Sequence, residues 1–367
     1  MLSCQSGRFG IIWPMENFAI GGRMEITTSR LRTLRLVRTV GAAWASAVLA
    51  AQLPAWAEKV EAPAGDVAVL RAAWGKFLDV PRDYAFAPSS RLVRTYAFDE
   101  FDCELHVQTN GPGTTQRVLL TLPKGLRGKV PAVVVPYYFP EAMIGRELET
   151  GQPLPRYAGR AFMADLARRG FICASAEAYH LTYAKSTRGR DDFKRWAEAG
   201  AALNRDWPTW TGIGKLVADT RLIIDLLAAD GRVDASRLGI LGHSLGGKMA
   251  FYTGCLDPRI KAIVASDFGM EWDRTNWEAA WYWGDKLPAA KASGLRHDQL
   301  LTLSGGTPFF LIAGESDTIG SFALMDKALG YEGRRNRLAG INHATGHAPP
   351  RYALEAAYSF LERYLKP

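Results

Sequence analysis

Cysteine is scarce in this chain, which argues against a disulfide-stabilised scaffold. Four cysteines occur in 367 residues, and their spacing matches no metal site. Internal repeats and low-complexity tracts are also lacking, so the pattern is not that of a fibrous or disordered chain. The remaining composition is ordinary, with 48% apolar and 22% charged residues. We therefore expect a globular protein with one large domain or two small ones and with no bound metal.

Basic residues exceed acidic ones, but they do not gather into a patch that would bind nucleic acid. The chain has 45 lysines and arginines against 37 acidic residues, a formal charge of +8. Half of this excess lies in residues 1–57, because residues 58–367 hold 39 basic and 35 acidic residues, a net +4. We therefore expect no nucleic-acid partner.

The N-terminal 57 residues have the pattern of an export signal. Several arginines precede an apolar run at 40–53, and Ala55-Trp56-Ala57 follows it. A charged region, a short apolar region and small residues at the −3 and −1 positions are typical of a cleaved signal peptide. The apolar run is shorter than the roughly 20 residues of a membrane-spanning helix. The sequence predicts cleavage after Ala57, a periplasmic or secreted protein and no stable membrane insertion; an uncleaved anchor is the alternative.

The mature chain is predicted to contain a leader segment, residues 58–90, and one domain, residues 91–367. Strand-like runs at 92–98 and 117–122 flank a turn at 110–113 and suggest antiparallel edge strands. Five short, continuously apolar runs then alternate with helical patterns, at 132–135, 171–176, 238–241, 262–265 and 309–313. Such runs are typical of strands buried on both faces of a parallel sheet.

These patterns predict an α/β fold, with a mostly parallel, doubly wound sheet and antiparallel N-terminal edge strands. The clearest helix is expected at 214–229, and a last helix is expected after Pro349-Pro350. Residues 270–306 interrupt the alternation, and we expect them to form a small inserted cap.

A serine stands on a sharp turn between a predicted buried strand and a predicted helix. The motif is Gly242-His243-Ser244-Leu245-Gly246, a G-x-S-x-G pattern in its strand–turn–helix setting. That turn projects the hydroxyl of Ser244 beyond the sheet, where it can act as a nucleophile. The N–H of Leu245, at the helix start, is then placed to bind an oxyanion.

A serine nucleophile needs a base, and the base needs an acid to hold it. In the chain order usual for this motif the acid follows a later strand and the histidine comes last. We expect Asp317 as the acid, with Glu315 and Asp267 as alternatives. His347, in a glycine turn before the last helix, is expected as the base, and His343 is the alternative.

Three segments carry a resemblance to a known family: Gly212-Ile213-Gly214-Lys215, the serine turn through Lys248, and Ser266-Asp267-Phe268-Gly269. On these residues, about 90–367 resemble an α/β-hydrolase of the bacterial dienelactone-hydrolase-like or acetylxylan-esterase-like branch. The resemblance implies nucleophile Ser244, acid Asp317, base His347, an oxyanion donor at Leu245 and no cofactor.

The chain departs from that family after the first predicted parallel strand. Such hydrolases usually have His-Gly there, to supply the second oxyanion donor, whereas this chain has Pro136-Tyr137-Tyr138. Proline has no N–H to donate. The backbone N–H of Tyr137 or of Tyr138 is therefore expected to serve.

Aromatic residues are concentrated in the predicted cap and suggest the kind of substrate. Trp277 and Trp281 could stack on a sugar or aryl ring, although packing residues would give the same composition. Lys248 has the serine–lysine spacing of glucuronoyl esterases, but Leu245 stands where those enzymes have arginine. Lys248 is therefore expected either to contact the substrate or to lie on the helix surface.

The expected function is hydrolysis of carboxylic esters, of a small molecule or a carbohydrate, through an acyl-serine intermediate. A serine peptidase of the prolyl-oligopeptidase type is the rival with the same fold, although residues 58–116 are too few for its usual accessory domain. A binding protein that kept the fold without catalysis is the rival of another class.

Overall fold

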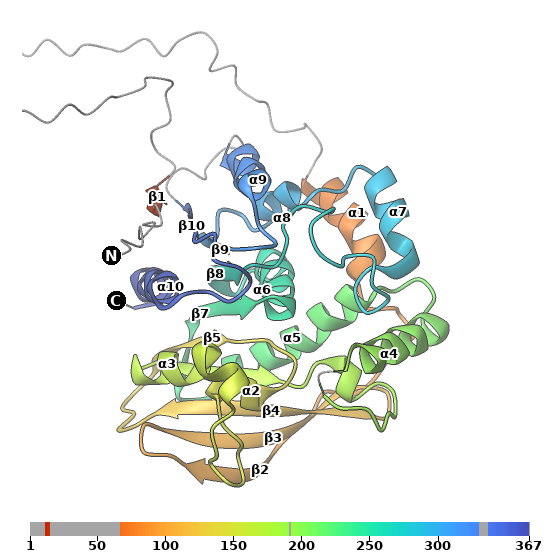
Figure 1. The fold of residues 1–367 in the computed structure, drawn as a ribbon. Helices are drawn as coiled ribbons and strands as arrows, with labels where there is room; N and C mark the ends of the chain where they lie inside the picture. The colour runs from red at the N-terminus through yellow and green to blue at the C-terminus, as the bar shows by residue number, and fades with distance from the viewer. Residues whose placement is uncertain (1–11, 15–66, 191, 330–336, 367) are drawn as a thin grey trace, which may run out of the picture.

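The computed structural model describes residues 12–14, 67–190, 192–329 and 337–366 (Figure 1). The predicted signal peptide, apart from residues 12–14, and residues 58–66 of the leader lie outside the described residues. None of the described helices is long and apolar enough to cross a membrane.

One large sheet organises the described residues. Its strands are β1 (Ile12–Pro14), β2 (Ser90–Ala97), β3 (Phe101–Gly111), β4 (Thr114–Pro123), β5 (Val130–Val134), β6 (Ile172–Ala176), β7 (Val233–His243), β8 (Ile260–Ser266), β9 (Phe309–Ala313) and β10 (Leu338–Asn342). Their order across the sheet is β1-β10-β9-β8-β7-β5-β6-β4-β3-β2. The strands from β10 to β6 in this order pair in parallel, and β4, β3 and β2 continue the sheet antiparallel. The predicted fold class is confirmed.

Helices cover both faces of the sheet (Figure 1). They are α1 (Val67–Leu78), α2 (Pro140–Ile144), α3 (Phe162–Arg168), α4 (Phe193–Asp206), α5 (Gly212–Ala229), α6 (Leu245–Leu256), α7 (Leu287–Ala292), α8 (His297–Leu303), α9 (Ile319–Leu329) and α10 (Arg351–Leu365). On one face the core includes α1, α5, α6 and α8, and on the other face it includes α2, α3 and α10.

Side chains of one strand alternate between these two cores, as the pleat requires. Val134 and Ile240 belong to the first core, whereas Val133 and Leu241 belong to the second. All four are buried, which explains why the central strands read as unbroken apolar runs.

Three strands, β1, β3 and β10, were not predicted from the sequence. Strand β3 pairs with both β2 and β4, so the turn at 110–113 joins β3 to β4 rather than joining the two predicted strands. The residues of β3 alternate between buried and half-buried positions. Polar residues such as Asp102 and Glu104 occupy the half-buried positions, so the strand has no continuous apolar run. Strand β10 is short and contains Gly340, which contributes no side chain to the pattern.

The segment 270–306 differs in part from the predicted cap. Its last helix, α8, belongs to the same core as α1 and α6 and follows β8 as part of the crossover to β9. Trp277 and Trp283 are fully buried in that core. The leader helix α1 belongs to the same core through Trp74, so the leader and the domain share one hydrophobic core.

Candidate active site

Ser244 lies on a strained turn between β7 and α6. Its backbone has φ 58° and ψ −118°, a conformation that residues other than glycine rarely adopt. A Cβ at position 242 would lie 1.9 Å from the carbonyl oxygen of Gly246, and one at position 246 would lie 2.0 Å from that of Pro136. Only glycine fits at both positions, so the turn has the geometry of a nucleophile elbow.

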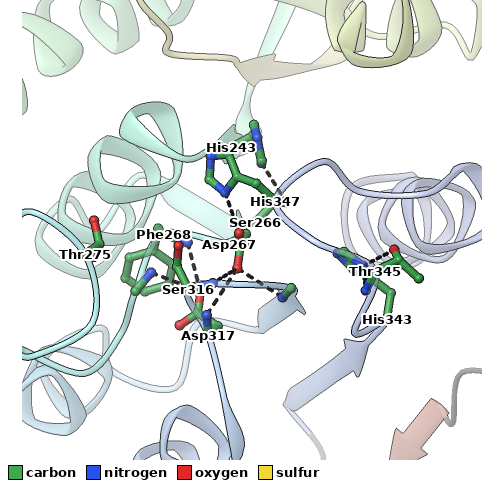
Figure 2. A network of polar contacts seen from close by, with 12 residues as sticks. His243, Ser266, Asp267, Phe268, Thr275, Ser316, Asp317, His343, Thr345 and His347 are labelled. Atoms are coloured by element: carbon green, nitrogen blue, oxygen red, sulfur yellow. Dashed lines mark hydrogen bonds and ion pairs between the residues drawn. The ribbon is translucent and has the colours of Figure 1, made fainter. Parts of the chain in front are cut away.

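The acidic partner of His347 is Asp267, at the carboxyl end of β8 (Figure 2). Oδ2 of Asp267 contacts Nδ1 of His347. Oδ1 accepts hydrogen bonds from the backbone N–H groups of Gly314, Ser316 and Asp317, at 3.0, 2.7 and 3.1 Å. Burial raises the pKa of Asp267, but the contact with His347 and these amides outweigh it and hold the pKa below its ordinary value. Asp267 is therefore a carboxylate that fixes the imidazole.

The structure corrects the assignment of Asp317 as that partner. The carboxylate of Asp317 accepts hydrogen bonds from the backbone N–H groups of Phe268, Gly269 and Met270, at 2.7 to 3.1 Å, and from Oγ of Ser321. It therefore binds the loop that follows Asp267, instead of reaching the histidine. Burial raises the pKa of Asp317.

The remaining alternative for the acid, Glu315, is exposed. The sequence favoured Asp317 over Asp267 wrongly, because both residues follow strands of the parallel sheet and spacing alone does not distinguish them. The contact between Oδ2 of Asp267 and Nδ1 of His347 identifies the carboxylate that faces the histidine loop.

His347, and not His343, lines the cavity at Ser244. His343 lies to one side, where Nδ1 is 2.8 Å from Oγ1 of Thr345 (Figure 2). Burial lowers the pKa of His343, which favours its neutral form.

A third histidine, His243, lies beneath the site. It is fully buried, its Nδ1 is 3.1 Å from Oγ of Ser266, and its ring centroid is 4.6 Å from that of His347. Burial lowers the pKa of His243 well below its ordinary value, with smaller contributions from His347 and Arg160. His243 is therefore a neutral side chain that packs beneath His347.

The cavity has a volume of about 220 Å³ and brings together five segments of the chain. Its lining residues are Tyr137, Tyr138, Arg156, Tyr157, Arg160, Phe193, Ser244 and His347. Arg156, Tyr157 and Arg160 come from a 3₁₀ helix, η1 (Pro155–Arg160), and Phe193 begins α4. No sequence motif marks these four residues, and only the fold brings them into one cavity with Ser244.

Both predicted oxyanion donors lie close to the serine. Leu245 is the first residue of α6, where backbone N–H groups have no partner within the helix. Pro136 is close enough to Gly246 to exclude a Cβ there, so the next residue, Tyr137, runs beside the elbow and lines the cavity. The assignment of these two N–H groups as donors stays a prediction.

The predicted substrate contacts differ from the observed lining. Lys248 is only 2% exposed; its Nζ donates to the carbonyl of Phe268 at 2.8 Å and to Oγ1 of Thr275 at 3.0 Å. Trp277 is fully buried and donates to the carbonyl of Gly269 at 2.8 Å. Neither side chain lines the cavity, so both hold the loop after Asp267 instead of contacting substrate.

Trp281 is closer to the expected role, because its ring stacks on that of Phe193. The two centroids are 5.9 Å apart and the rings are nearly parallel, at 2°. Phe193 is 58% exposed and lines the cavity. Trp281 therefore supports an aromatic wall, and Phe193 presents it.

Comparisons with known proteins agree with the observed fold. A glucuronoyl esterase from Solibacter usitatus superimposes with a TM-score of 0.59 at 13% identity, over 81% of this chain and 91% of that one. A glucuronoyl esterase from Teredinibacter turnerae gives a TM-score of 0.60 at 20% identity, over 81% and 83%. This chain has the α/β-hydrolase fold.

Other comparisons point to the same fold. Acetyl xylan esterase 1 from Thermoanaerobacterium gives a TM-score of 0.53 at 15% identity, over 80% of this chain and 92% of that one. The prolyl oligopeptidase family matches residues 196–367, which hold Ser244, Asp267 and His347. No curated protein matches the sequence.

Within this α/β-hydrolase fold, the site has the parts of an acyl-transfer centre. The strained turn presents a hydroxyl, and an imidazole fixed by a buried carboxylate lines the same cavity. Among the described residues, no group of three histidine, cysteine or acidic side chains could hold a metal ion.

Proposed function

We propose that the protein hydrolyses carboxylic esters through an acyl-serine intermediate on Ser244. The observation that carries the proposal is a serine on a strained elbow that shares a cavity with His347, whose Nδ1 contacts the buried Asp267. A Ser–His–Asp set of this kind is the usual apparatus of acyl transfer.

The proposed reaction begins when Nε2 of His347 takes the proton of Ser244 as its oxygen attacks the ester carbonyl. The negative charge that develops on the carbonyl oxygen is stabilised by the N–H of Leu245 and that of Tyr137. The tetrahedral intermediate expels the alcohol, which receives its proton from His347. Water, activated by His347, then attacks the acyl-serine and releases the acid.

We propose a sugar ester or an aryl ester as the substrate. Tyr138, Tyr157 and Phe193 give the cavity aromatic walls on which a ring could stack. The structural neighbours named glucuronoyl and acetyl xylan esterases support a carbohydrate ester.

We also propose that the protein is exported after cleavage at Ala57, on the pattern of its first 57 residues.

Peptide hydrolysis is the second candidate, because the prolyl oligopeptidase family matches residues 196–367. Both reactions use the same nucleophile and base, and they differ in the leaving group. The comparison of an ester with the corresponding amide therefore separates them.

The first test measures hydrolysis by the chain from residue 58 and by its Ser244→Ala variant. The substrates are para-nitrophenyl acetate, acetylated xylan, a methyl glucuronate ester and a peptide para-nitroanilide. We expect ester hydrolysis by the unsubstituted chain, and a loss of at least about 10³-fold in the variant, because the nucleophile is removed. Ser304→Ala, in a turn that does not line the cavity, is the matched control. Hydrolysis of the anilide in preference to every ester would favour the peptidase, and no hydrolysis of any substrate would refute both.

A further inference from the structure

Arg160, one of the two arginines that line the cavity, has no anionic partner among the described residues. Nη1 of Arg160 is 3.3 Å from the hydroxyl of Tyr137, and Nη2 is 3.0 Å from the carbonyl oxygen of Arg156. Neither acceptor carries a negative charge. Within the described ranges, no carboxylate lies within ion-pair distance of Arg160, whereas the partly buried Arg117 and Arg232 both have such partners.

The contacts of Arg160 hold its guanidinium in place without neutralising it. Its Cζ also lies 5.7 Å from the centre of the Tyr157 ring, which packs beside it at the cavity wall. A guanidinium has five N–H donors in a planar fork. Two neutral contacts leave donors for a ligand, and the fork matches a carboxylate in two-point geometry.

Arg160 lies in the same cavity as the groups proposed to perform catalysis, Ser244 and His347. Its positive charge also contributes, after burial and His347, to the low pKa of His243, which packs against the ring of His347. A ligand that binds Arg160 would therefore lie in the same small cavity as the reacting carbonyl.

We propose that Arg160 binds a carboxylate carried by the substrate, so that the preferred substrates are esters of acidic compounds. This inference rests on the proposed ester hydrolysis and specifies its substrate class. The aromatic walls at Tyr138, Tyr157 and Phe193 would pack on the ring of an aromatic or sugar acid, while Arg160 binds the acid group. The carboxylate lies either in the alcohol part of the ester or in its acyl part.

A different role for Arg160, stabilisation of the oxyanion, makes a different prediction. The oxyanion forms with every ester, whereas a carboxylate is present only in some. Loss of an oxyanion donor would therefore lower the rate with charged and neutral substrates equally. Loss of a carboxylate-binding group changes the ratio between them.

The test compares two pairs of esters, in each of which a free carboxylate is replaced by its neutral methyl ester. Para-acetoxybenzoate and its methyl ester place the carboxylate in the alcohol part, and mono-para-nitrophenyl succinate and its methyl ester place it in the acyl part. We expect the unsubstituted protein to prefer the charged member of one pair by about tenfold or more in kcat/KM, the range for a hydrogen bond between charged groups. Arg160→Gln should lower that preference by about tenfold or more, and Arg160→Lys should retain part of it because the charge remains.

Arg205→Gln is the matched control, because Arg205 is 72% exposed in α4 and does not line the cavity. It should leave the preference unchanged. A preference near one in both pairs would overturn the inference. Equal losses with charged and neutral esters in Arg160→Gln, with circular dichroism like that of the unsubstituted protein, would assign Arg160 to the oxyanion instead and overturn it too.

A binding measurement separates this inference from the proposed function. Calorimetry with the Ser244→Ala protein should show para-hydroxybenzoate binding at least about tenfold more tightly than para-hydroxybenzamide, and Arg160→Gln in that background should remove the difference. If esters are hydrolysed but the two ligands bind equally, the inference fails alone. If the difference is present but no ester is hydrolysed, the proposed function fails and the carboxylate site stands.

Discussion

At the scale of single residues, two buried aspartates 50 positions apart have separate tasks. Asp267 contacts His347, and Asp317 binds the backbone of the loop that follows Asp267. Sequence order correctly predicted an acid after a strand of the parallel sheet, but it favoured Asp317, which was wrong. The choice depends on where each loop turns, and that is decided by hydrogen bonds between residues far apart in the chain.

Substitution of each aspartate by asparagine should separate the two tasks. Asp267→Asn leaves the imidazole without its carboxylate, and kcat should fall about 10³- to 10⁴-fold, as when the corresponding acid of a serine protease is replaced. Asp317→Asn puts an amide group among backbone N–H donors, and it should lower the free energy of unfolding by about 1–3 kcal/mol. Its kcat should fall by less than that of Asp267→Asn. Ester kinetics and urea unfolding measure the two effects, and a larger loss of kcat in Asp317→Asn would refute the division.

Lys248 gives a prediction about stability and pH. Burial lowers the pKa of Lys248 to about 7, against an attraction from Asp317 and Asp267. Below pH 7 both the folded and the unfolded chain hold the proton. Between about pH 7 and 10.5 only the unfolded chain holds it, so this residue makes stability rise with pH by up to about 1.4 kcal/mol per pH unit.

Lys248→Met should remove that rise. The difference in free energy of unfolding between the unsubstituted protein and the variant is measured by urea unfolding from pH 6 to 10. Lys194→Met, at an exposed position, is the control and should leave the slope unchanged. A difference that stays constant with pH would show that the pKa of Lys248 is not lowered.

At the scale of elements, the sequence predicted the helices and strands whose apolar residues recur at a regular spacing. It missed strands and loops whose position depends on contacts with distant parts of the chain. Helix α5 and the central strands are apolar on faces that local spacing reveals. Strand β3 was missed because its polar positions alternate with its buried ones and its place depends on pairing with β2 and β4. The arginines of η1 were missed for the same reason: they join the site only because the chain between β5 and β6 returns past Ser244.

The leader helix α1 should contribute to the stability of the domain. Trp74 is fully buried and contacts the rings of Tyr252 and Trp283, with centroids 5.9 and 6.1 Å away. Trp74→Ala should therefore lower the free energy of unfolding by about 3–5 kcal/mol, the usual cost of removing a large buried side chain. Val69→Ala, on the same helix but 63% exposed, should change it by less than about 0.5 kcal/mol. Equal effects in urea unfolding would show that α1 does not pack on the domain.

At the scale of the whole molecule, the reactivity and number of the cysteine thiols test both the burial of the cysteines and the cleavage of the signal segment. Cys103, Cys173 and Cys255 are buried and form no disulfide with one another, and burial raises the pKa of Cys103 to about 12. Their thiols should therefore react with an aromatic disulfide reagent only after unfolding, because the reactive thiolate is scarce and inaccessible. The fourth cysteine, Cys4, lies in the predicted signal segment.

The number of thiols therefore tests the proposed cleavage after Ala57. Protein recovered from the periplasm or medium of a bacterial host should show no fast-reacting thiol when folded and three thiols per chain in denaturant. Four thiols per chain, or an N-terminal sequence that begins before residue 58, would show that the segment is retained. Three thiols together with a fast reaction in the folded state would contradict the burial of the cysteines without affecting the cleavage, so the two results distinguish the two claims.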